Sequence, residues 1–185
     1  MIDNYEFSGD PARLDAALVH RWLSTDAYWA LGRTRAQQDR AIAGSLNFGA
    51  YDTVTGAQVA YARVITDRVT FAWLCDVYVA REVRGKGIGR ALVAAVRDHL
   101  APYDLRRILL ATSDAHGVYE NVGFQPLENP GQWWPTAASS ARSPAPCPDD
   151  AVPIRLRAPY GSATHPATRT SPDARCTARK PKGRS

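Results

Sequence analysis

The residues best suited to binding an anion lie in the short stretch RGKGIGR, residues 84–90, in which three glycines alternate with other residues. A β-branched run precedes this stretch and an apolar-periodic segment follows it, so it connects a predicted strand to a predicted helix. Backbone N–H groups at a helix N-terminus bind anions, and glycines let a phosphate approach the chain closely. Arg84, Lys86 and Arg90 add positive charge. We therefore expect this loop to bind a phosphate or pyrophosphate group.

Two familiar phosphate-binding loops do not fit this stretch. A P-loop requires G-x-x-x-x-G-K-[ST], but here Lys86 precedes the last two glycines and no Ser or Thr follows. The Rossmann fingerprint requires G-x-G-x-x-G. It fails because Arg90 or Leu92 would stand at its last position, depending on which glycine comes first.

Two motifs together resemble the GNAT superfamily of N-acetyltransferases. RGKGIG fits the R-x-x-G-x-G pyrophosphate loop of that family, and AHGVYENVGF at 115–124 looks like its later A-x-x-x-Y-x-x-x-GF element. The resemblance implies a GNAT fold and an acyltransferase that uses acetyl-CoA as co-substrate and no metal. It further implies direct attack by a primary amine of a small molecule or peptide within a ternary complex.

The resemblance also implies which residues contact coenzyme A. The family's strand before the loop splays from its neighbour, so its backbone can serve the pantetheine arm and the oxygen that gains negative charge. Thr112 stands where many members carry an asparagine, and its hydroxyl can replace part of that hydrogen bonding. The expected cofactor residues are Val77, Tyr78, Val79, Arg84, Gly85, Lys86, Gly87, Ile88, Gly89, Arg90 and Thr112.

Tyr119 is the expected proton donor to the leaving thiolate. The resembling family places a tyrosine near the sulfur of coenzyme A, and a phenol with a pKa of about 10 can protonate a departing thiolate. The alternative is a core tyrosine whose hydroxyl is hydrogen-bonded within the protein.

Three candidates remain for removing the proton of the amine: Asp76, His116 and water. Asp76 lies in an apolar strand, where a carboxylate is costly unless it is paired. The alternative to a catalytic role for Asp76 is a salt bridge to Arg63 or Arg68. His116 lies one helical turn before Tyr119 on the same helix face and could relay a proton. The alternative is an exposed histidine without a catalytic role.

The acceptor is expected to bind at the segment STDAYWALGRTR, residues 24–35. Tyr28 and Trp29 can form apolar walls, and Arg33 can hold a carboxylate. Alternatively, the two aromatic residues pack a pair of helices together. The sequence does not distinguish among five acceptors: an amino acid, a polyamine, an aromatic amine, an antibiotic and a peptide N-terminus.

The elements that must position these residues follow an α/β (α+β) order, with a twisted, mixed but mostly antiparallel sheet flanked by helices. Asp10 and Pro11 begin the first predicted helix, Gly44 ends the second, and Ser113 or Asp114 caps the last. We expect strands at 4–10, 45–52, 58–67, 69–80, 106–113 and 123–127, and helices at 12–25, 34–45, 89–101 and 114–122.

The composition changes near Trp134, so we expect an acetyltransferase domain at 1–134 and a low-complexity, disordered tail at 135–185. Nine of the 13 prolines follow Gly131, and residues 131–185 hold 9 of the 23 Lys and Arg but 3 of the 18 Asp and Glu. The net charge of +5 therefore comes from the tail. A basic tail that binds nucleic acid or an acidic surface is a weaker alternative, because its charges are spread thinly among prolines. A non-catalytic module that binds coenzyme A on the same fold is another alternative.

No apolar run approaches the roughly 20 residues of a membrane span, and the first ten residues lack the features of a signal peptide. The three cysteines are widely spaced and indicate neither a disulfide framework nor a zinc site. We therefore expect a cytoplasmic protein without a membrane partner, and the sequence is compatible with a homodimer.

Overall fold

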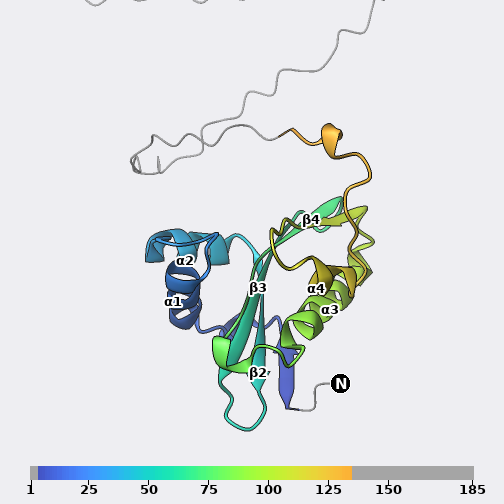
Figure 1. Ribbon diagram of the computed structural model, residues 1–185. Coiled ribbons are helices and arrows are strands. Elements are labelled where there is room, and N and C mark those ends of the chain that lie inside the picture. The colour runs from blue at the N-terminus through green and yellow to red at the C-terminus, as the bar shows by residue number, and fades with distance from the viewer. Residues whose placement is uncertain (1–3, 135–185) are drawn as a thin grey trace, which may run out of the picture. The chain divides into compact units, whose positions relative to one another are not determined.

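The computed structural model describes residues 4–134, which form a five-stranded sheet with helices on both faces (Figure 1). The strands follow their sequence order across the sheet; the first three pairings are antiparallel and the last is parallel. This confirms the predicted mixed, mostly antiparallel sheet. The predicted tail at 135–185 lies outside the described residues. The strands are β1 (Tyr5–Ser8), β2 (Leu46–Asp52), β3 (Gln58–Thr66), β4 (Phe71–Val79) and β5 (Arg107–Leu109).

The helices α1 (Ala16–Asp26) and α2 (Arg35–Ala43) lie on one face of the sheet, and α3 (Ile88–Leu100) and α4 (His116–Glu120) lie on the other (Figure 1). The prediction for α2 is confirmed at both ends. Thr34 and Gln37 form a reciprocal capping box at its start, and Gly44 ends it.

The first helix begins later than predicted. Asp10 caps a short 3-10 turn at Pro11–Arg13, where its side chain accepts a hydrogen bond from the N–H of Ala12. The α-helix begins after a second cap, Asp15, whose carboxylate accepts from the N–H of Leu18 at 2.9 Å. The Asp-Pro signal therefore marks the short 3-10 turn before α1 and not, as predicted, the start of α1 itself.

Two predictions near the end of the domain are wrong. No strand forms at 123–127 in the described structure; Pro126 has no N–H to donate to a ladder there. Neither Ser113 nor Asp114 caps α4. The N-cap position is Ala115, and its N–H donates instead to the hydroxyl of Thr112 at 3.1 Å.

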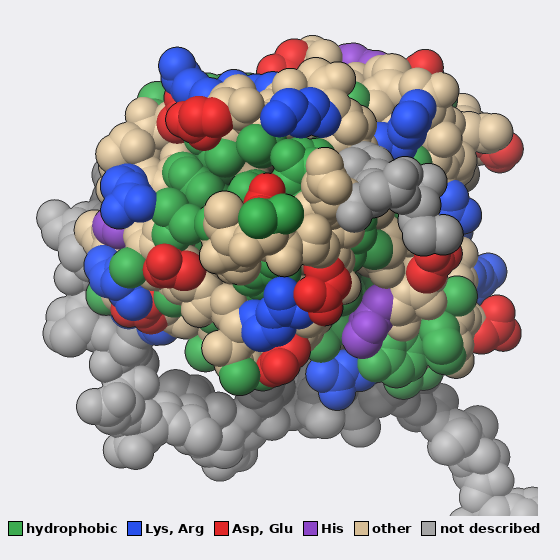
Figure 2. Space-filling model, turned by 90° about the horizontal axis from the view of Figure 1, so that it is seen from below, with side chains coloured by type: hydrophobic (Ala, Val, Ile, Leu, Met, Phe, Trp, Pro, Cys, Tyr) green, Lys and Arg blue, Asp and Glu red, His purple; other side chains and the backbone are tan. Residues whose placement is uncertain are grey.

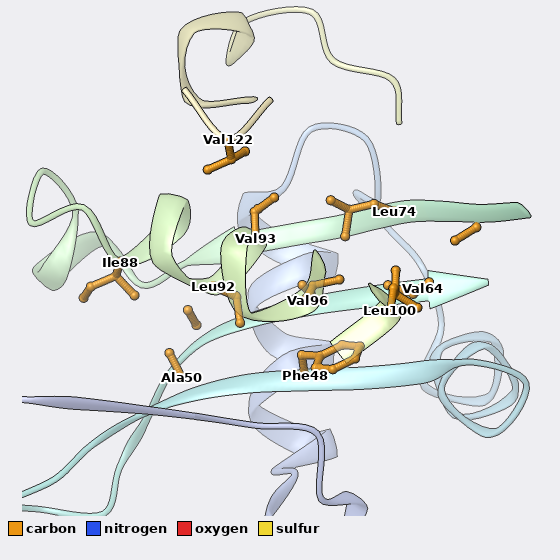
Figure 3. Packing of buried hydrophobic residues seen from close by; sticks show 13 residues of the cluster. Phe48, Ala50, Val64, Leu74, Ile88, Leu92, Val93, Val96, Leu100 and Val122 are labelled. Atoms are coloured by element: carbon orange, nitrogen blue, oxygen red, sulfur yellow. The ribbon is translucent and has the colours of Figure 1, made fainter. Parts of the chain in front are cut away.

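The main core lies between α3 and the sheet, as Figure 3 shows. One face of α3 is apolar, and each fully buried aliphatic side chain contributes about 1.5–3 kcal/mol to folding. Ile88 is the first residue of the helix and is 1% exposed, so core packing also fixes where α3 begins. The buried residues of α3 are Ile88, Leu92, Val93, Val96 and Leu100, which face Phe48, Ala50, Val64 and Leu74 of the strands.

Strand β4 carries a β-bulge at Asp76. Tyr61 pairs with Tyr78 and Arg63 pairs with Cys75, so three steps along β4 oppose two steps along β3. Asp76 has φ 52°, in the left-handed region that non-glycine residues rarely adopt. Such an extra residue bends a strand and re-aims its side chains.

The bulge reverses the alternation of side chains along β4. Ala72 and Leu74 lie in the core beneath α3, and a regular strand would send Tyr78 to the same side. Instead, Tyr78 packs with α1, while Val77 and Val79 pack against the α3 core. The bulge therefore places Asp76 and Tyr78 on the face that carries α1 and α2.

One face of the described domain is mixed in charge. Figure 2 shows basic and acidic side chains interspersed on the face seen there, rather than a continuous basic area. No helix within residues 4–134 is long and apolar enough to cross a membrane.

Candidate active site

A cleft of about 1290 Å³ opens where β4 and β5 diverge. β5 pairs with β4 only along Phe71–Trp73, so the rest of β4 has no partner strand on this edge among the described residues. One part of the cleft is bordered by residues 83–90, and we call it the loop arm. A second part, the aromatic arm, is bordered by Tyr28, Trp29, Trp73 and Asp114.

The loop arm contains the N-terminus of α3. The N-cap residue is Gly87, which has no side chain to cap the helix, so the first N–H groups of α3 have no intrahelical partner. These belong to Ile88, Gly89 and Arg90, which all border the cleft, and the exposed side chains of Lys86 and Arg90 stand beside them. The arrangement can bind an anion through backbone N–H groups, the helix dipole and two cations.

The glycines of the loop arm serve different purposes. Gly85 and Gly87 have φ 78° and 80°, a backbone conformation that disfavours any side chain. A Cβ atom on Gly89 would lie 3.3 Å from Cγ2 of Val79, so this glycine allows α3 to approach β4 closely. Turn conformation and helix–strand packing therefore require these glycines even before a ligand is considered.

Arg84, predicted to contact the phosphate, has its guanidinium bound to protein groups. It donates to the carbonyl of Val79 at 2.9 Å and pairs with Asp26, the last residue of α1, at 3.1 Å. Asp26 also accepts from Arg81 and from the hydroxyl of Tyr78, the latter at 2.7 Å. Hydrogen bonds from Arg81 and then Tyr78 hold the pKa of Asp26 well below its usual value. This cluster joins the end of α1 to the loop arm.

The backbone of Val79 faces the cleft. The N–H of Ala80 donates to the carbonyl of Val59 at 2.9 Å, and alternate residues of an antiparallel ladder turn their groups to opposite edges. The N–H and C=O of Val79 therefore point away from β3. Arg84 occupies the carbonyl, which leaves the N–H available to a ligand; the side chain of Tyr78 is buried on the other face against Trp22.

Tyr119 borders the cleft from α4. Its ring packs edge-to-face on Phe124 with centroids 6.0 Å apart, and its hydroxyl makes no hydrogen bond to any residue of the described domain. Burial, with smaller effects from Asp114 and Tyr28, raises the pKa of Tyr119. The hydroxyl therefore keeps its proton at neutral pH and lacks the internal partner that the core-tyrosine alternative requires.

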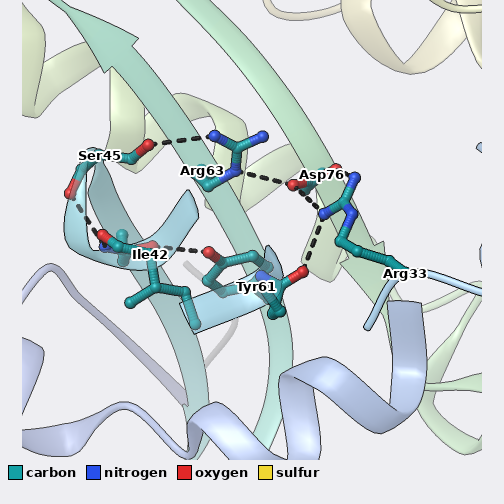
Figure 4. A network of polar contacts seen from close by, with 8 residues as sticks. Arg33, Ile42, Ser45, Tyr61, Arg63 and Asp76 are labelled. Atoms are coloured by element: carbon teal, nitrogen blue, oxygen red, sulfur yellow. Dashed lines mark hydrogen bonds and ion pairs between the residues drawn. The ribbon is translucent and has the colours of Figure 1, made fainter. Parts of the chain in front are cut away.

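Asp76 is buried between two arginines, as Figure 4 shows. Its carboxylate accepts from Arg33 at 2.8 Å and from Arg63 at 2.7 Å, and its side chain is 3% exposed. Burial acts to raise the pKa of Asp76, but the hydrogen bonds and charges of the two guanidiniums outweigh it and lower the pKa. The alternative of a salt bridge to Arg63 is thus realised, and Arg33, predicted to hold a substrate carboxylate, is bound to Asp76 instead.

This network extends behind the cleft. Arg63 also donates to the hydroxyl of Ser45 at 3.1 Å, and Arg33 donates to the amide oxygen of Gln38 at 2.9 Å. Gln38 is fully buried, and its amide nitrogen has no hydrogen-bond partner in the part of the chain that the structure describes. Arg68, the other partner considered for Asp76, lies in the turn between β3 and β4.

Two further predicted residues occupy different positions. Thr112 borders the cleft, and its hydroxyl holds the start of α4 through the N–H of Ala115. His116 is exposed and is absent from the residues that border the cleft within the described domain. The side chain of His116 is therefore poorly placed to relay a proton from the cleft.

Tyr28 and Trp29 do not pack the helix pair. They are 55% and 44% exposed, lie edge-to-face with centroids 4.9 Å apart, and border the cleft. Ala27 and Ala30 occupy the buried positions of this segment. The hydroxyl of Tyr28 is hydrogen-bonded to that of Ser113, which joins the segment after α1 to the loop before α4.

The cleft residues that the prediction missed include Asp26, Trp73 and Asp114. Trp73 belongs to the apolar alternation of β4 and carried no functional signal of its own. Asp114 was considered only as a helix cap. Asp26 is the last residue of α1, just beyond the predicted helix at 12–25, and its partners lie 52 residues or more further along the chain, as the hydrogen bond to Tyr78 illustrates.

Comparison with known proteins identifies related sequences and folds. Residues 16–124 match the model of the Acetyltransferase (GNAT) family. A protein of Gibberella zeae that is assigned as an acetyltransferase is 33% identical over 141 residues, covering 66% of this chain and 80% of its own length.

Solved structures agree with this match. A Xanthomonas campestris protein assigned to the GNAT acetyltransferases is 46% identical with a TM-score of 0.67, covering 72% of this chain and 93% of its own. Glucosamine-6-phosphate N-acetyltransferase from Arabidopsis thaliana is 16% identical with a TM-score of 0.50, covering 67% and 93%, and shows the shared fold alone.

Proposed function

The chain belongs to the GNAT family of acetyltransferases, and from this premise we propose that it transfers the acetyl group of acetyl-CoA to a primary amine. The family uses acetyl-CoA as co-substrate, and acetyl transfer is its reaction. The observation that carries the proposal is that the N-terminus of α3, which has no side-chain cap, and the hydroxyl of Tyr119, which has no hydrogen-bond partner within residues 4–134, border the same cleft.

The loop arm fits the pyrophosphate of acetyl-CoA. The first N–H groups of α3 can donate hydrogen bonds to the phosphate oxygens, and Lys86 and Arg90 balance the negative charge of the phosphates. Arg84 braces the loop through Nε and Nη2, and its Nη1 makes no hydrogen bond within residues 4–134, so Arg84 can also donate to a phosphate. The N–H of Val79, on the unpaired edge of β4, can bind the pantetheine arm as an added strand would.

Acetyl-CoA supplies a thioester, in which the acetyl carbon is bonded to a sulfur that can leave as a thiolate. The amine nitrogen forms a bond to this carbon within the ternary complex as the carbon–sulfur bond breaks. Tyr119 donates its hydroxyl proton to the departing sulfur and recovers a proton from water. The proton lost by the amine passes to water, so the products are an acetamide and a free thiol.

Water is better placed to accept this proton than either side chain predicted for that role. Asp76 is engaged by two guanidiniums that lower its pKa, and a carboxylate stabilised as an anion is a weak base. His116 does not border the cleft. We assign Asp76 to holding Arg33 and the adjoining chain in place.

Two measurements test the proposal. Acetyl-CoA should raise the melting temperature of the protein, whereas ATP and NAD at equal concentration should have little effect, because they lack the pantetheine arm. Release of free thiol should then depend on an added amine. Stabilisation by acetyl-CoA without turnover on a broad panel of amines would indicate the non-catalytic alternative, and no stabilisation would contradict the assignment of the loop arm.

A further inference from the structure

The aromatic arm exposes aromatic rings to the cleft. Tyr28 and Trp29 follow α1, and Trp73 comes from β4, on the strand face opposite to the α3 core. The hydrogen bond between Tyr28 and Ser113 draws the loop before α4 to these rings. Aromatic side chains exposed in a cleft suit a ligand with an apolar body, and their faces attract a cation.

Asp114 adds a carboxylate to this arm. It follows Ser113, the residue that contacts Tyr28, and it is exposed and borders the cleft. It forms no ion pair with any residue between 4 and 134. Both Asp114 and Tyr28 also affect the pKa of Tyr119, which agrees with their lying near the proposed proton donor.

Unlike the carboxylate of Asp114, the positive charges of the cleft lie outside the aromatic arm. Among the described residues that border the cleft, the basic ones are Arg84, Lys86 and Arg90, and all three belong to the loop arm. Arg33 and Arg63 lie behind the cleft and are paired with Asp76. A carboxylate on the acceptor would therefore meet the negative charge of Asp114 and no available cation in the aromatic arm.

We infer that the acceptor is a cationic amine with an aromatic body and no carboxylate, that is, an arylalkylamine. Asp114 binds its ammonium group as it enters, and the rings of the aromatic arm enclose its body. An amino acid is excluded by charge, and a polyamine lacks the flat body that the rings would pack against. This inference rests on the proposed function and specifies the substrate class of the same site.

Phenethylamine and phenylalanine form a matched pair, because they differ by a carboxylate alone. We expect kcat/KM for phenethylamine to exceed that for phenylalanine, and for spermidine, by about tenfold or more. Asp114→Asn should lower kcat/KM for phenethylamine about tenfold while leaving the Kd of acetyl-CoA unchanged. Glu120→Gln is the control, since Glu120 is exposed on α4 and does not border the cleft.

Equal or better turnover of phenylalanine or spermidine would overturn the inference, as would an Asp114→Asn variant with parental kcat/KM for phenethylamine. Binding of phenethylamine is followed separately by tryptophan fluorescence in the presence of coenzyme A. Binding that depends on Asp114 without any turnover would support the arylalkylamine site and contradict the proposed reaction. Absence of both binding and turnover would overturn the inference, even where acetyl-CoA still stabilises the protein.

Discussion

The two arms of the cleft are built in different ways. The loop arm comes from one continuous stretch, residues 83–90, and is held by two left-handed glycines and by the burial of Ile88. The aromatic arm is formed by the segment after α1, by β4 and by the loop before α4, and exposed contacts such as that between Tyr28 and Ser113 join them. A local motif can therefore define a binding site for a common co-substrate, whereas the acceptor site depends on how distant segments meet.

Because the two arms are built differently, mutations in the loop arm and in the aromatic arm should have different consequences. Changes in the loop arm act on backbone conformation and should affect binding of acetyl-CoA whatever the acceptor is. Changes in the aromatic arm should affect the choice of acceptor and leave acetyl-CoA binding intact. Gly87→Val in the loop arm and Asp114→Asn in the aromatic arm test this separation directly.

The largest effect is expected at Tyr119, because its proton is needed for turnover whichever arm of the cleft is considered. Tyr119→Phe keeps the ring and its contact with Phe124 but removes the proton, so kcat should fall by roughly 10²–10⁴. The KM for acetyl-CoA should change little, because the lost interaction acts mainly in the transition state. Measuring kcat and melting temperature on one preparation decides the matter. A folded variant with parental kcat would remove Tyr119 from the mechanism.

A smaller effect is expected from the buried network behind the aromatic arm. Asp76→Asn leaves Arg33 and Arg63 without their anion, which should lower the free energy of unfolding by about 3 kcal/mol at pH 7. The pKa of Asp76 is lowered on folding, so its stabilisation is present above the unfolded pKa of about 4 and is lost as the pH falls through the folded value.

The difference in unfolding free energy between parent and Asp76→Asn should therefore shrink between pH 7 and pH 3, as measured by urea denaturation. Asp39→Asn is the matched control, because Asp39 pairs with Arg35 in an exposed ion pair and should contribute little at either pH. A constant difference across this range would show that the stabilisation by Asp76 does not depend on its charge.

The smallest effect is expected from the loop arm. Gly87→Val places a β-branched residue at φ 80° and should weaken acetyl-CoA binding at least about tenfold, or 1.4 kcal/mol. Gly56→Val is a matched control, because Gly56 has φ 71° in the turn between β2 and β3, away from the cleft. The control should lose stability without losing affinity, as calorimetry would show. Unchanged affinity in a folded Gly87→Val variant would place the phosphate elsewhere.

The sequence by itself determined the features that depend on neighbours along the chain. The glycine spacing of residues 84–90 predicted a turn before α3, and Gly44 marked the end of α2. Such signals are reliable because capping and turn hydrogen bonds join residues three or four positions apart. The order of strands and helices up to β5 followed from the same local periodicity.

Local sequence signals gave wrong predictions for the segments around and after α4. The stretch at 123–127 suggested a strand, but Pro126 has no N–H to donate to a ladder, and this stretch pairs with no strand among the described residues. Ser113 was suggested as a cap for α4, yet its hydroxyl bonds to Tyr28, 85 residues away along the chain. A serine can cap a helix or form a long-range hydrogen bond, and its tertiary surroundings decide which of the two it does.

Only the tertiary structure decided the surroundings of Asp76 and of the aromatic arm. One extra residue in β4 turned Asp76 toward Arg33, which lies 43 positions away, and made a predicted base into an ion-pair partner. A shift of one residue in a strand moves every later side chain to the opposite face, and nothing in the alternation of β4 signals it. Asp114 likewise borders the same cleft as Tyr28 only because β5 pairs parallel to β4 and carries the next loop to that edge.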